Sequence, residues 1–578
     1  MIYFLKLNKI MNNTIIYIID NYRCKKRSCI VIRYLAILLL SIIISSCSKD
    51  FLDRGSKIIF DDNNFWTSEN NVKSYCWEFY NRFIGYGTGT NGDFYFTTFN
   101  DDQAASGMNL FPTNAAATDS NWEYSYIRKA NLLLIRAGKV PMSTEAINHY
   151  LGVAHFFRAY EYANLIRHFG DVPYISSYLD QNQTDLIYTP RTPRSIVVDS
   201  IMTDLQFAAK NCRNISRSKS LGDINVLSQE AAWAYLSRVA LYEASYSKYV
   251  TGDITKAEKL FKIAYDAASN LIANDQYQLT SVYRHNYNSL ELSNNPEMIL
   301  YKSYVSGVLT HSVVGYTNSS TMMSGLTKDA VDSYLCTDGL PITLSPLYKG
   351  DDTGPLTLEN RDLRLVQTID STLAYIGTPN DKGFTSSTGY KITKFDNSSL
   401  TASETLVPNN PTDAPIFWLS EVYLNYAEAA AELGILTQQD LNNTINLLRK
   451  RAGVSDLILT NVPDDPLRDS DVSPLLWEIR RERRSELMMD GFRQWDIRRW
   501  GKLSYLNPIV KPAIFMGAKV PLPQINGPSV DAQGYILPYG DNATRPVIIP
   551  KNYLDAIPTG QITLYTLKGV DFPQNPGW

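Results

Sequence analysis

A pair of consecutive helical patterns in the middle of the chain constrains its fold most strongly. Apolar side chains recur three or four positions apart between residues 228 and 249, as they do on one face of an α-helix. They are Ala232, Tyr235, Leu236, Val239, Tyr242 and Tyr246. A second pattern, at 254–273, follows after a short Thr-Gly-Asp turn. Because helices joined by so short a turn pack antiparallel, the sequence predicts a helical hairpin here.

A similar arrangement returns nearer the carboxyl end. Apolar residues follow helical spacing from Leu419 to Leu433, and the residues Thr437 to Asp440 predict a capping box that opens a partner helix at 441–452. Helix pairs of this size look like tetratricopeptide units, whose period is about 34 residues. The literal repeat pattern of such units is not met, so periodicity alone only suggests them.

The rest of the chain alternates between helical and loop-rich composition. A long helix is predicted at 145–168, capped by Ser143 or Thr144. Residues 281–415 and the chain after Arg499 are rich in Gly, Pro, Asn, Ser and Thr, with short β-like runs such as MILYKSYV and YKITKF. We therefore expect a mostly α fold, in which tetratricopeptide-like helix pairs pack against a loop-rich carboxyl half with a few short strands.

The beginning of the chain has the pattern of a secretory signal. A basic run precedes an apolar segment from Tyr34 to Ile44, and Ser45-Ser46-Cys47 follows. The apolar segment is shorter than the roughly 20 residues that a membrane-spanning helix needs. The residues Ile44 to Cys47 resemble the bacterial lipobox, in which the cysteine is acylated. The sequence thus predicts a signal peptide at 1–46, a lipid anchor on Cys47 and a tether at 47–65, although an ordinary cleaved signal is the alternative.

Cleavage before Cys47 would make the protein more acidic. Seven of the 55 basic and one of the 58 acidic residues precede Cys47, so 48 and 57 remain and the net charge becomes −9. Such a chain has no electrostatic reason to bind nucleic acid or anionic lipid headgroups. Beyond Cys47, three cysteines remain in the mature chain, Cys76, Cys212 and Cys336. They allow at most one disulfide and have no metal-type CxxC spacing.

Common catalytic motifs are missing from the sequence. There is no GxSxG, HExxH or GxxxxGK[ST], and the five histidines show no ligand spacing. Residues 87–92 match GxGxxG, but no predicted strand precedes them, so a dinucleotide site is not indicated. Asp101 and Asp102 could imitate a glycosidase pair, whose carboxyl groups stand about 5 to 9.5 Å apart, but adjacent loop residues seldom meet that geometry. We expect no enzyme activity, cofactor or metal.

An arginine-rich helix is predicted near residue 480. Its cations Arg480, Arg481, Arg483 and Arg484 could suggest an anionic ligand, but Glu478, Glu482 and Glu486 are interleaved at helical spacing. Pairing on the helix itself, or with acidic residues elsewhere in the fold, is the better interpretation. The flanking Trp495 and Trp500 are expected to seal the core.

Several stretches together resemble the SusD/RagB family of outer-membrane nutrient-binding lipoproteins of Bacteroidetes. They follow the family's order over nearly the entire mature chain: CSKDFLD, RAYEYANLIRHFGDVP, AAWAYLSRVALYEA, NPEMILYKSY, APIFWLSEVYLNYAEAAAELG, INLLRKRAGV, IRRERRSELMMDGFRQWDIRRWGK, YLDAIPTGQITL and QNPGW. The resemblance implies four tetratricopeptide-like helix pairs. It also implies one intertwined globular unit, with an amino-terminal helical region at 66–280 and a carboxyl-terminal region at 281–578.

The same resemblance implies a location and a partner. The lipoprotein would sit at the outer membrane, exposed on the cell surface, as a lid over a SusC-like transporter energised through TonB. Three function classes follow: a nutrient-binding protein, most readily for an oligosaccharide or polysaccharide, a surface adhesin or protein-binding scaffold, and a cryptic hydrolase that the missing motifs disfavour. Some family members capture peptides, so a peptide ligand is also open.

Carbohydrate recognition needs flat aromatic rings beside polar groups, because a pyranose ring has apolar C–H faces as well as hydroxyls. The segment 86–122 offers both kinds of side chain. In the resembled family, ligand aromatics lie on loops at about this distance from the lipid cysteine and again in the early carboxyl half. The predicted ligand-binding residues are Trp122, Tyr95, Phe96, Asp101, Asp102, Tyr304 and Tyr316.

Overall fold

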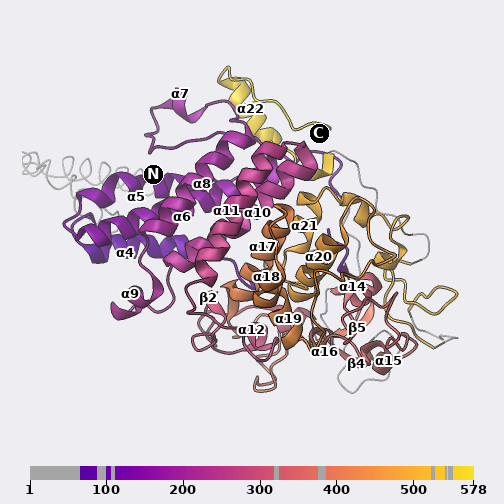
Figure 1. The fold of residues 1–578 in the computed structure, drawn as a ribbon. Helices are drawn as coiled ribbons and strands as arrows, with labels where there is room; N and C mark the ends of the chain where they lie inside the picture. Colours follow the sequence, from indigo (N-terminus) through magenta and orange to yellow (C-terminus); the bar gives the residue numbers. More distant parts are fainter. Residues whose placement is uncertain are drawn as a thin grey trace, which may run out of the picture. The chain divides into compact units, whose positions relative to one another are not determined.

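Helix α6, Thr144–Phe169, is the central element of the amino-terminal half (Figure 1). The Ser143 hydroxyl accepts a hydrogen bond from the Ala146 N–H at 3.1 Å and so caps its first turn. The helix ends at Gly170, whose φ of 71° lies in the left-handed region that favours glycine. Both predicted ends are confirmed, with Ser143 rather than Thr144 as the cap.

The structure is a computed structural model and describes residues 65–87, 99–105, 111–317, 324–374, 386–521, 528–540, 543 and 551–578. The chain divides into two units, Met1–Thr67 and Ser68–Trp578, and the second contains the helices and strands from α4, Glu69–Trp77, onward. The predicted signal peptide and Cys47 lie outside the described residues. Among the helices within them, none combines the length and the apolar character needed to cross a bilayer.

The amino-terminal half is an array of helices that pack side by side. Helices α5, Ser125–Arg136, and α8, Arg194–Asn211, both pack on α6. Helix α10, Gln229–Tyr246, contacts α8 and forms the predicted hairpin with α11, Ile254–Ile272. A π-type turn at Ser247–Thr251 and Gly252 connect the two helices of this hairpin. The array is the helical part that the apolar spacing predicts.

Helix α17, Leu419–Glu432, joins this array to the carboxyl half by packing against both α11 and α20, Pro474–Glu486. The predicted capping box is confirmed, because Thr437 and Asp440 exchange side-chain to backbone hydrogen bonds. The predicted partner helix, however, is interrupted at Thr444. It is divided into α18, Gln438–Asn443, and α19, Ile445–Arg451, because Thr444 leaves the helical region with φ −135° and ψ −87°.

The described strands pair into three two-stranded antiparallel sheets. Strand β2, Met298–Lys302, pairs with β6, Ala414–Trp418; β1, Gln103–Ala105, with β3, Ser324–Leu326; and β4, Ile369–Ala374, with β5, Gly389–Ile392. Shorter helices fill the loops: α7 (Thr184–Ile187), α9 (Ile215–Ser220), α12 (His285–Asn288), α13 (Val313–Thr317), α14 (Lys328–Ser333), α15 (Gly354–Leu358), α16 (Leu363–Thr368), α21 (Arg493–Arg499) and α22 (Thr559–Leu567). The expected fold class, mostly α with a few short strands, is confirmed.

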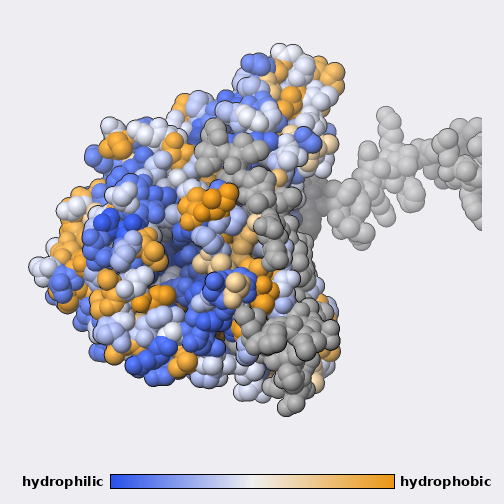
Figure 2. Space-filling model, turned by 90° about the vertical axis from the view of Figure 1, so that its right-hand side faces the viewer, coloured by the Kyte–Doolittle hydropathy of each residue, from blue (hydrophilic) through white to orange (hydrophobic). Residues whose placement is uncertain are grey.

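One side of the molecule carries β4, β5 and α15 (Figure 1). It faces the viewer in Figure 2, where the surface is hollowed and hydrophilic residues line much of the hollow. Hydrophobic residues form separate patches around it in this view.

An aromatic cluster forms the core between the helix array and strand β6. The Phe83 ring lies 5.4 Å from the Phe157 ring and 5.9 Å from the Phe417 ring, measured between ring centroids. The Tyr160 and Tyr235 rings lie beside them, tilted toward each other with their centroids 5.2 Å apart. Edge and tilted contacts of this kind add to the burial of apolar area, so the cluster fixes α6, α10 and β6 relative to one another.

Helix α20 is the centre of a buried arginine–carboxylate network. Arg364 pairs with Asp362 at 2.6 Å and with Glu486 at 2.9 Å, and its Nη1 also lies 2.6 Å from Glu482 Oε1. Arg449 contacts Glu478 and Glu482, and Arg451 contacts Glu486. The prediction that α20 pairs with charges elsewhere in the fold is confirmed, and Arg481 pairs with Glu478 on the helix itself.

The chain near residues 554–575 returns to the end of α6. The Asn575 side-chain amide donates to the Phe169 carbonyl at 3.0 Å, and the Asp555 N–H donates to the His168 carbonyl. A Cβ on Gly170 would approach Leu554 Cδ1 to 2.8 Å, so the Leu554 side chain would have to shift. The carbonyls that α6 leaves unpaired at its end are thus satisfied by residues nearly 400 positions away.

The three cysteines Cys76, Cys212 and Cys336 are buried and unpaired. Burial raises the pKa of the Cys76 thiol, and the same effect raises that of Cys212. Both thiols are therefore protonated at neutral pH and act as small core side chains.

Candidate functional site

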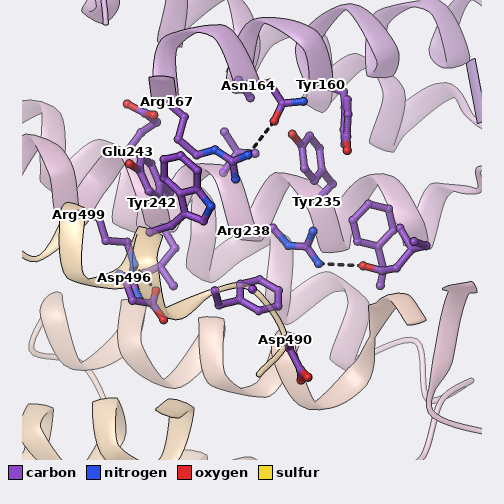
Figure 3. A pocket seen from close by; sticks show the side chains of 18 of the residues that line it. Tyr160, Asn164, Arg167, Tyr235, Arg238, Tyr242, Glu243, Asp490, Asp496 and Arg499 are labelled. Carbon is purple, nitrogen blue, oxygen red and sulfur yellow. Dashed lines mark hydrogen bonds and ion pairs between the residues drawn. The ribbon is translucent and has the colours of Figure 1, made fainter. Parts of the chain in front are cut away.

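A pocket of about 170 Å³ opens between α6, α10, β6 and α21 (Figure 3). We call it the interhelical pocket. Its lining combines aromatic rings with amide, guanidinium and carboxylate groups. The lining residues are Phe83, Tyr160, Ala163, Asn164, Arg167, Tyr235, Arg238, Val239, Leu241, Tyr242, Glu243, Pro415, Ile416, Phe417, Trp418, Arg483, Asp490, Gly491, Phe492, Trp495, Asp496 and Arg499.

Helical periodicity brings the polar side chains of the pocket together. Tyr160, Asn164 and Arg167 are four and three positions apart along α6 and lie on one face of it (Figure 3). Tyr235 and Arg238 follow the same spacing on α10. Because both helices are fixed by the aromatic cluster, these side chains start from rigid backbone positions.

Arg238 is held in place on the pocket wall. Its Nε and Nη2 each donate to a Glu421 carboxylate oxygen at 2.6 Å, and Nη2 also donates to the Ile416 carbonyl at 2.9 Å. Burial lowers the pKa of Arg238, but the Glu421 charge and hydrogen bonds outweigh burial and raise it. Arg238 therefore stays charged, with its charge neutralised inside the protein.

Trp495 has a different position from the one that we expect from the sequence. It is only partly buried and lines the interhelical pocket. The Arg167 guanidinium lies 4.0 Å from the centre of its ring and the Arg498 guanidinium 5.0 Å from it. Trp500, by contrast, is buried and donates to Glu428 at 2.7 Å, as a core residue would. Of the two tryptophans that we expect in the core, Trp500 lies there and Trp495 lines the pocket instead.

A second cavity, of about 240 Å³, lies where the chain after Phe99 meets the last described segment. We call it the tail pocket. Its aromatic lining comes from Phe99, Phe111 and Trp578, and its polar lining includes Asp119, Asn552 and Asp555. Phe99 belongs to the segment 86–122, in which the sequence predicts a ligand site, so part of that segment does line a cavity.

Asp101 and Asp102 lie in a buried ion-pair cluster rather than at either pocket. Arg493 donates to both carboxylate oxygens of Asp101, at 2.6 and 2.8 Å, and Arg484 donates to Asp102 at 2.7 Å. Burial raises the pKa of Asp101, but the charges of Arg484 and Arg493 hold it well below its usual range. Both carboxylates are engaged by arginines in this structure.

The other predicted ligand residues are not gathered into one place. Tyr95 and Phe96 lie outside the described residues. Trp122 packs against Phe169, with ring centres 5.0 Å apart, and Tyr304 is buried against His311 at 4.6 Å. Tyr316 is partly exposed on α13. None of the described members of the predicted set lines the interhelical or the tail pocket.

The pocket residues Arg167 and Arg238 have no distinctive motif in the sequence. Their signal is the helical spacing of polar residues within a largely buried helix, such as Tyr160, Asn164 and Arg167 in the run YEYANLIR. A polar stripe on a buried helix faces either a pocket or a buried partner, and only the structure separates these two cases.

Two family models match the chain. One, described as the SusD family, matches residues 257–578, and one described as "Starch-binding associating with outer membrane" matches residues 51–241. Among curated proteins, SusD-like protein P38 of Formosa agariphila is 25% identical over 438 residues, covering 71% of this chain and 77% of that protein. SusD-like protein P2 of the same organism is 26% identical over 428 residues, covering 69% and 76%.

Solved structures share the fold at low sequence identity. A SusD-like carbohydrate-binding protein of Bacteroides fragilis superposes with a TM-score of 0.67 at 22% identity, covering 86% of this chain and 99% of that one. A surface glycan-binding protein A of Bacteroides fluxus superposes with a TM-score of 0.59 at 19% identity, covering 89% and 100%. These two likenesses establish the fold.

Proposed function

The chain belongs to the SusD family, and we propose from this that it binds a saccharide at the outer membrane and hands it to a SusC-like transporter. The proposal is one of binding without catalysis. It is supported by the names of the relatives, which include a carbohydrate-binding and a glycan-binding protein. The observation that carries it in this molecule is the chemistry of the interhelical pocket.

The interhelical pocket has the two properties that a saccharide site needs. Trp495 and Phe492 are partly exposed aromatic residues of the lining, and aromatic rings suit the apolar C–H face of a pyranose. Asn164 and Arg167 line the same pocket and offer polar groups to sugar hydroxyls, and the Arg167 guanidinium lies 4.0 Å from the centre of the Trp495 ring. The rings and the polar groups are carried by helices, or lie next to one, so the site is formed before a ligand arrives.

Replacing Trp495 by alanine is expected to weaken saccharide binding about tenfold, because one ring–sugar stack is worth about 1 kcal/mol or somewhat more by analogy with aromatic pairs. The measurement is titration calorimetry against a panel of glycans and peptides, with thermal unfolding as the check on folding. Release of shorter saccharides during the titration would reveal turnover and contradict a pure binding role.

The matched control is Trp77→Ala. Trp77 lies on α4 with 42% of its surface exposed and does not line the interhelical pocket, so its loss should leave affinity unchanged. If Trp495→Ala binds as tightly as the unaltered protein, the interhelical pocket is not the site. The same titration with Trp122→Ala and Tyr95→Ala then tests the segment that the sequence predicts.

We further propose that Cys47 is the lipidated amino terminus of the mature protein and holds it on the cell surface beside its transporter. The support comes from the lipobox-like sequence and from the family description that associates a matching model with the outer membrane. Several acyl chains on one residue anchor firmly, since each buried methylene contributes about 0.8 kcal/mol.

Cys47→Ala is expected to move the protein from the membrane to the soluble fraction and to abolish lipid labelling. Cell fractionation and labelling with a lipid precursor measure this. Mild-detergent purification of the unaltered protein should bring down a partner of barrel size. Protease treatment of intact cells should digest the lipoprotein if it is exposed on the cell surface. Protein that stays membrane-bound and labelled after the substitution would refute the anchor, and recovery without a barrel in several detergents would refute the partner.

A further inference from the structure

The charges of the interhelical pocket are compensated inside the protein with one exception. Arg238 pairs with Glu421, and Arg483 and Arg499 both pair with Asp496. On the acidic side, both oxygens of Glu243 accept from Arg194 at 2.8 and 2.9 Å, and Asp490 pairs with the buried Lys394. Each of these lining charges therefore has an opposite charge beside it.

Arg167 is the exception. Its Nη2 donates to the Asn164 side-chain carbonyl at 3.0 Å (Figure 3), and its guanidinium stacks on the Trp495 ring. Within the part of the chain that the structure describes, no carboxylate forms an ion pair with it. The lining consequently carries one positive charge that the described protein does not neutralise.

The same pocket also has surplus hydrogen-bond donors. The Arg167 Nε–H, the Tyr242 hydroxyl and the Trp418 Nε1–H are all buried, belong to lining residues and contact no described acceptor. Burial raises the pKa of Tyr242 to about 12, so its hydroxyl keeps its proton at neutral pH. Buried donors are normally satisfied, so this excess of donors over acceptors makes the lining suited to a ligand rich in acceptor oxygens.

The stacked geometry of Arg167 suits an anion. A guanidinium that lies over an aromatic face keeps its N–H groups in the plane of the group, directed toward its edges. Those edges match the two oxygens of a carboxylate or sulfate, and charged hydrogen bonds of this kind are about twice as strong as neutral ones. Asn164 occupies Nη2 of Arg167, and Nη1 donates to no described acceptor, so Nη1 is left for a ligand.

We propose that the interhelical pocket selects an anionic saccharide, in which a carboxylate or sulfate group on the sugar ring contacts Arg167 while the ring stacks near Trp495. This inference rests on the proposed saccharide-binding function and narrows it to acidic ligands. The attraction is local, because the chain after the predicted cleavage site has a net charge of −9 and as a whole repels anions. Selection should thus come from the pocket and not from long-range steering.

The test is titration calorimetry on the full chain, expressed with its own leader and purified in mild detergent. The probes are oligogalacturonates and their methyl esters, which share a ring backbone and differ in charge, together with sulfated and unsulfated glucan oligomers. At moderate salt we expect the acidic member of at least one pair to bind about tenfold more tightly than its neutral partner. The pair that shows the difference identifies carboxylate or sulfate as the recognised group.

Arg167→Gln should weaken the acidic oligomers about tenfold more than the neutral ones and so remove this preference, and Arg167→Lys should restore part of it. The matched control is Arg128→Gln. Arg128 also lies over an aromatic ring, 4.3 Å from the centre of the Tyr178 ring, but it is exposed on α5 and does not line the pocket. The control should keep the full preference.

The possible outcomes separate this inference from the function on which it rests. Neutral and acidic oligomers that bind equally, or a preference that survives Arg167→Gln, would overturn anion selection and leave saccharide binding intact. A folded protein that binds no member of the panel would overturn both. Equal loss of preference in Arg167→Gln and Arg128→Gln would show that net charge, and not the pocket, selects the ligand.

Discussion

Replacing Arg364 by methionine is expected to lower the free energy of unfolding by about 3–5 kcal/mol, which is the usual cost of removing one partner from a buried ion pair. The Arg364 side chain is 1% exposed, and its partners Asp362, Glu482 and Glu486 are equally buried. Without the guanidinium, these carboxylates would be left close together and away from water. Methionine keeps most of the volume, so the loss reports on charge and hydrogen bonding rather than on a cavity.

Urea unfolding followed by tryptophan fluorescence measures this effect, and Arg217→Met is the matched control. Arg217 also pairs with a glutamate, Glu145, but both side chains are nearly half exposed. Exposed pairs contribute about 0–1 kcal/mol, so the control should unfold almost as the unaltered protein does. Similar small losses for both variants would show that the buried network contributes specificity rather than stability.

Acidification is expected to remove about 3 kcal/mol of stability through a single residue, Glu428, as the pH falls from about 5 to about 2. Burial raises the pKa of Glu428, but the charge of Arg499 and its two hydrogen bonds at 2.7 and 2.6 Å outweigh burial. The result is a pKa lowered from 4.5 to about 2. Since the unfolded chain binds the proton first, the stabilisation is present above pH 4.5 and is lost below it.

The measurement is the free energy of unfolding in urea at a series of pH values. Glu428→Gln should be less stable at neutral pH and should lose less stability on acidification, because the titrating group is gone. Asp101 and Asp555, whose pKa values are also lowered, keep part of the acid sensitivity in this variant. Glu78→Gln, at a half-exposed pair with Lys129, is the control. An unchanged acid slope in Glu428→Gln would contradict the assignment.

Local patterns in the sequence predicted the helices well, because the forces that form them act over a few residues. The Ser143 cap, the hairpin of α10 and α11 and the capping box at Thr437 all follow from spacings within one or two turns. The break at Thr444 does not follow from such spacings, because the apolar spacing continues through Thr444 although the helical backbone is interrupted there. A periodic pattern shows which face is buried and not whether the helix is continuous.

The candidate site was harder to predict, because its residues meet only in the folded chain. Asp101 and Asp102 look like free loop carboxylates in the sequence, yet the arginines that engage them follow 382 and 392 positions later. Trp495 and Trp500 are five positions apart in one helical region, yet one lines a pocket and the other is core. No local spacing distinguishes these cases, and one sequence contains no other information about distant pairing.

The return of residues 554–575 to the end of α6 affects when the protein can fold. The last turn of α6 obtains hydrogen-bond partners at Phe169 and His168 only after almost 400 further residues have been synthesised. Contacts between such distant segments close large loops and slow folding. While the chain is still being made, the amino-terminal helices therefore lack part of their native surroundings. The end of α6, although it lies early in the sequence, thus completes its native structure only late in synthesis.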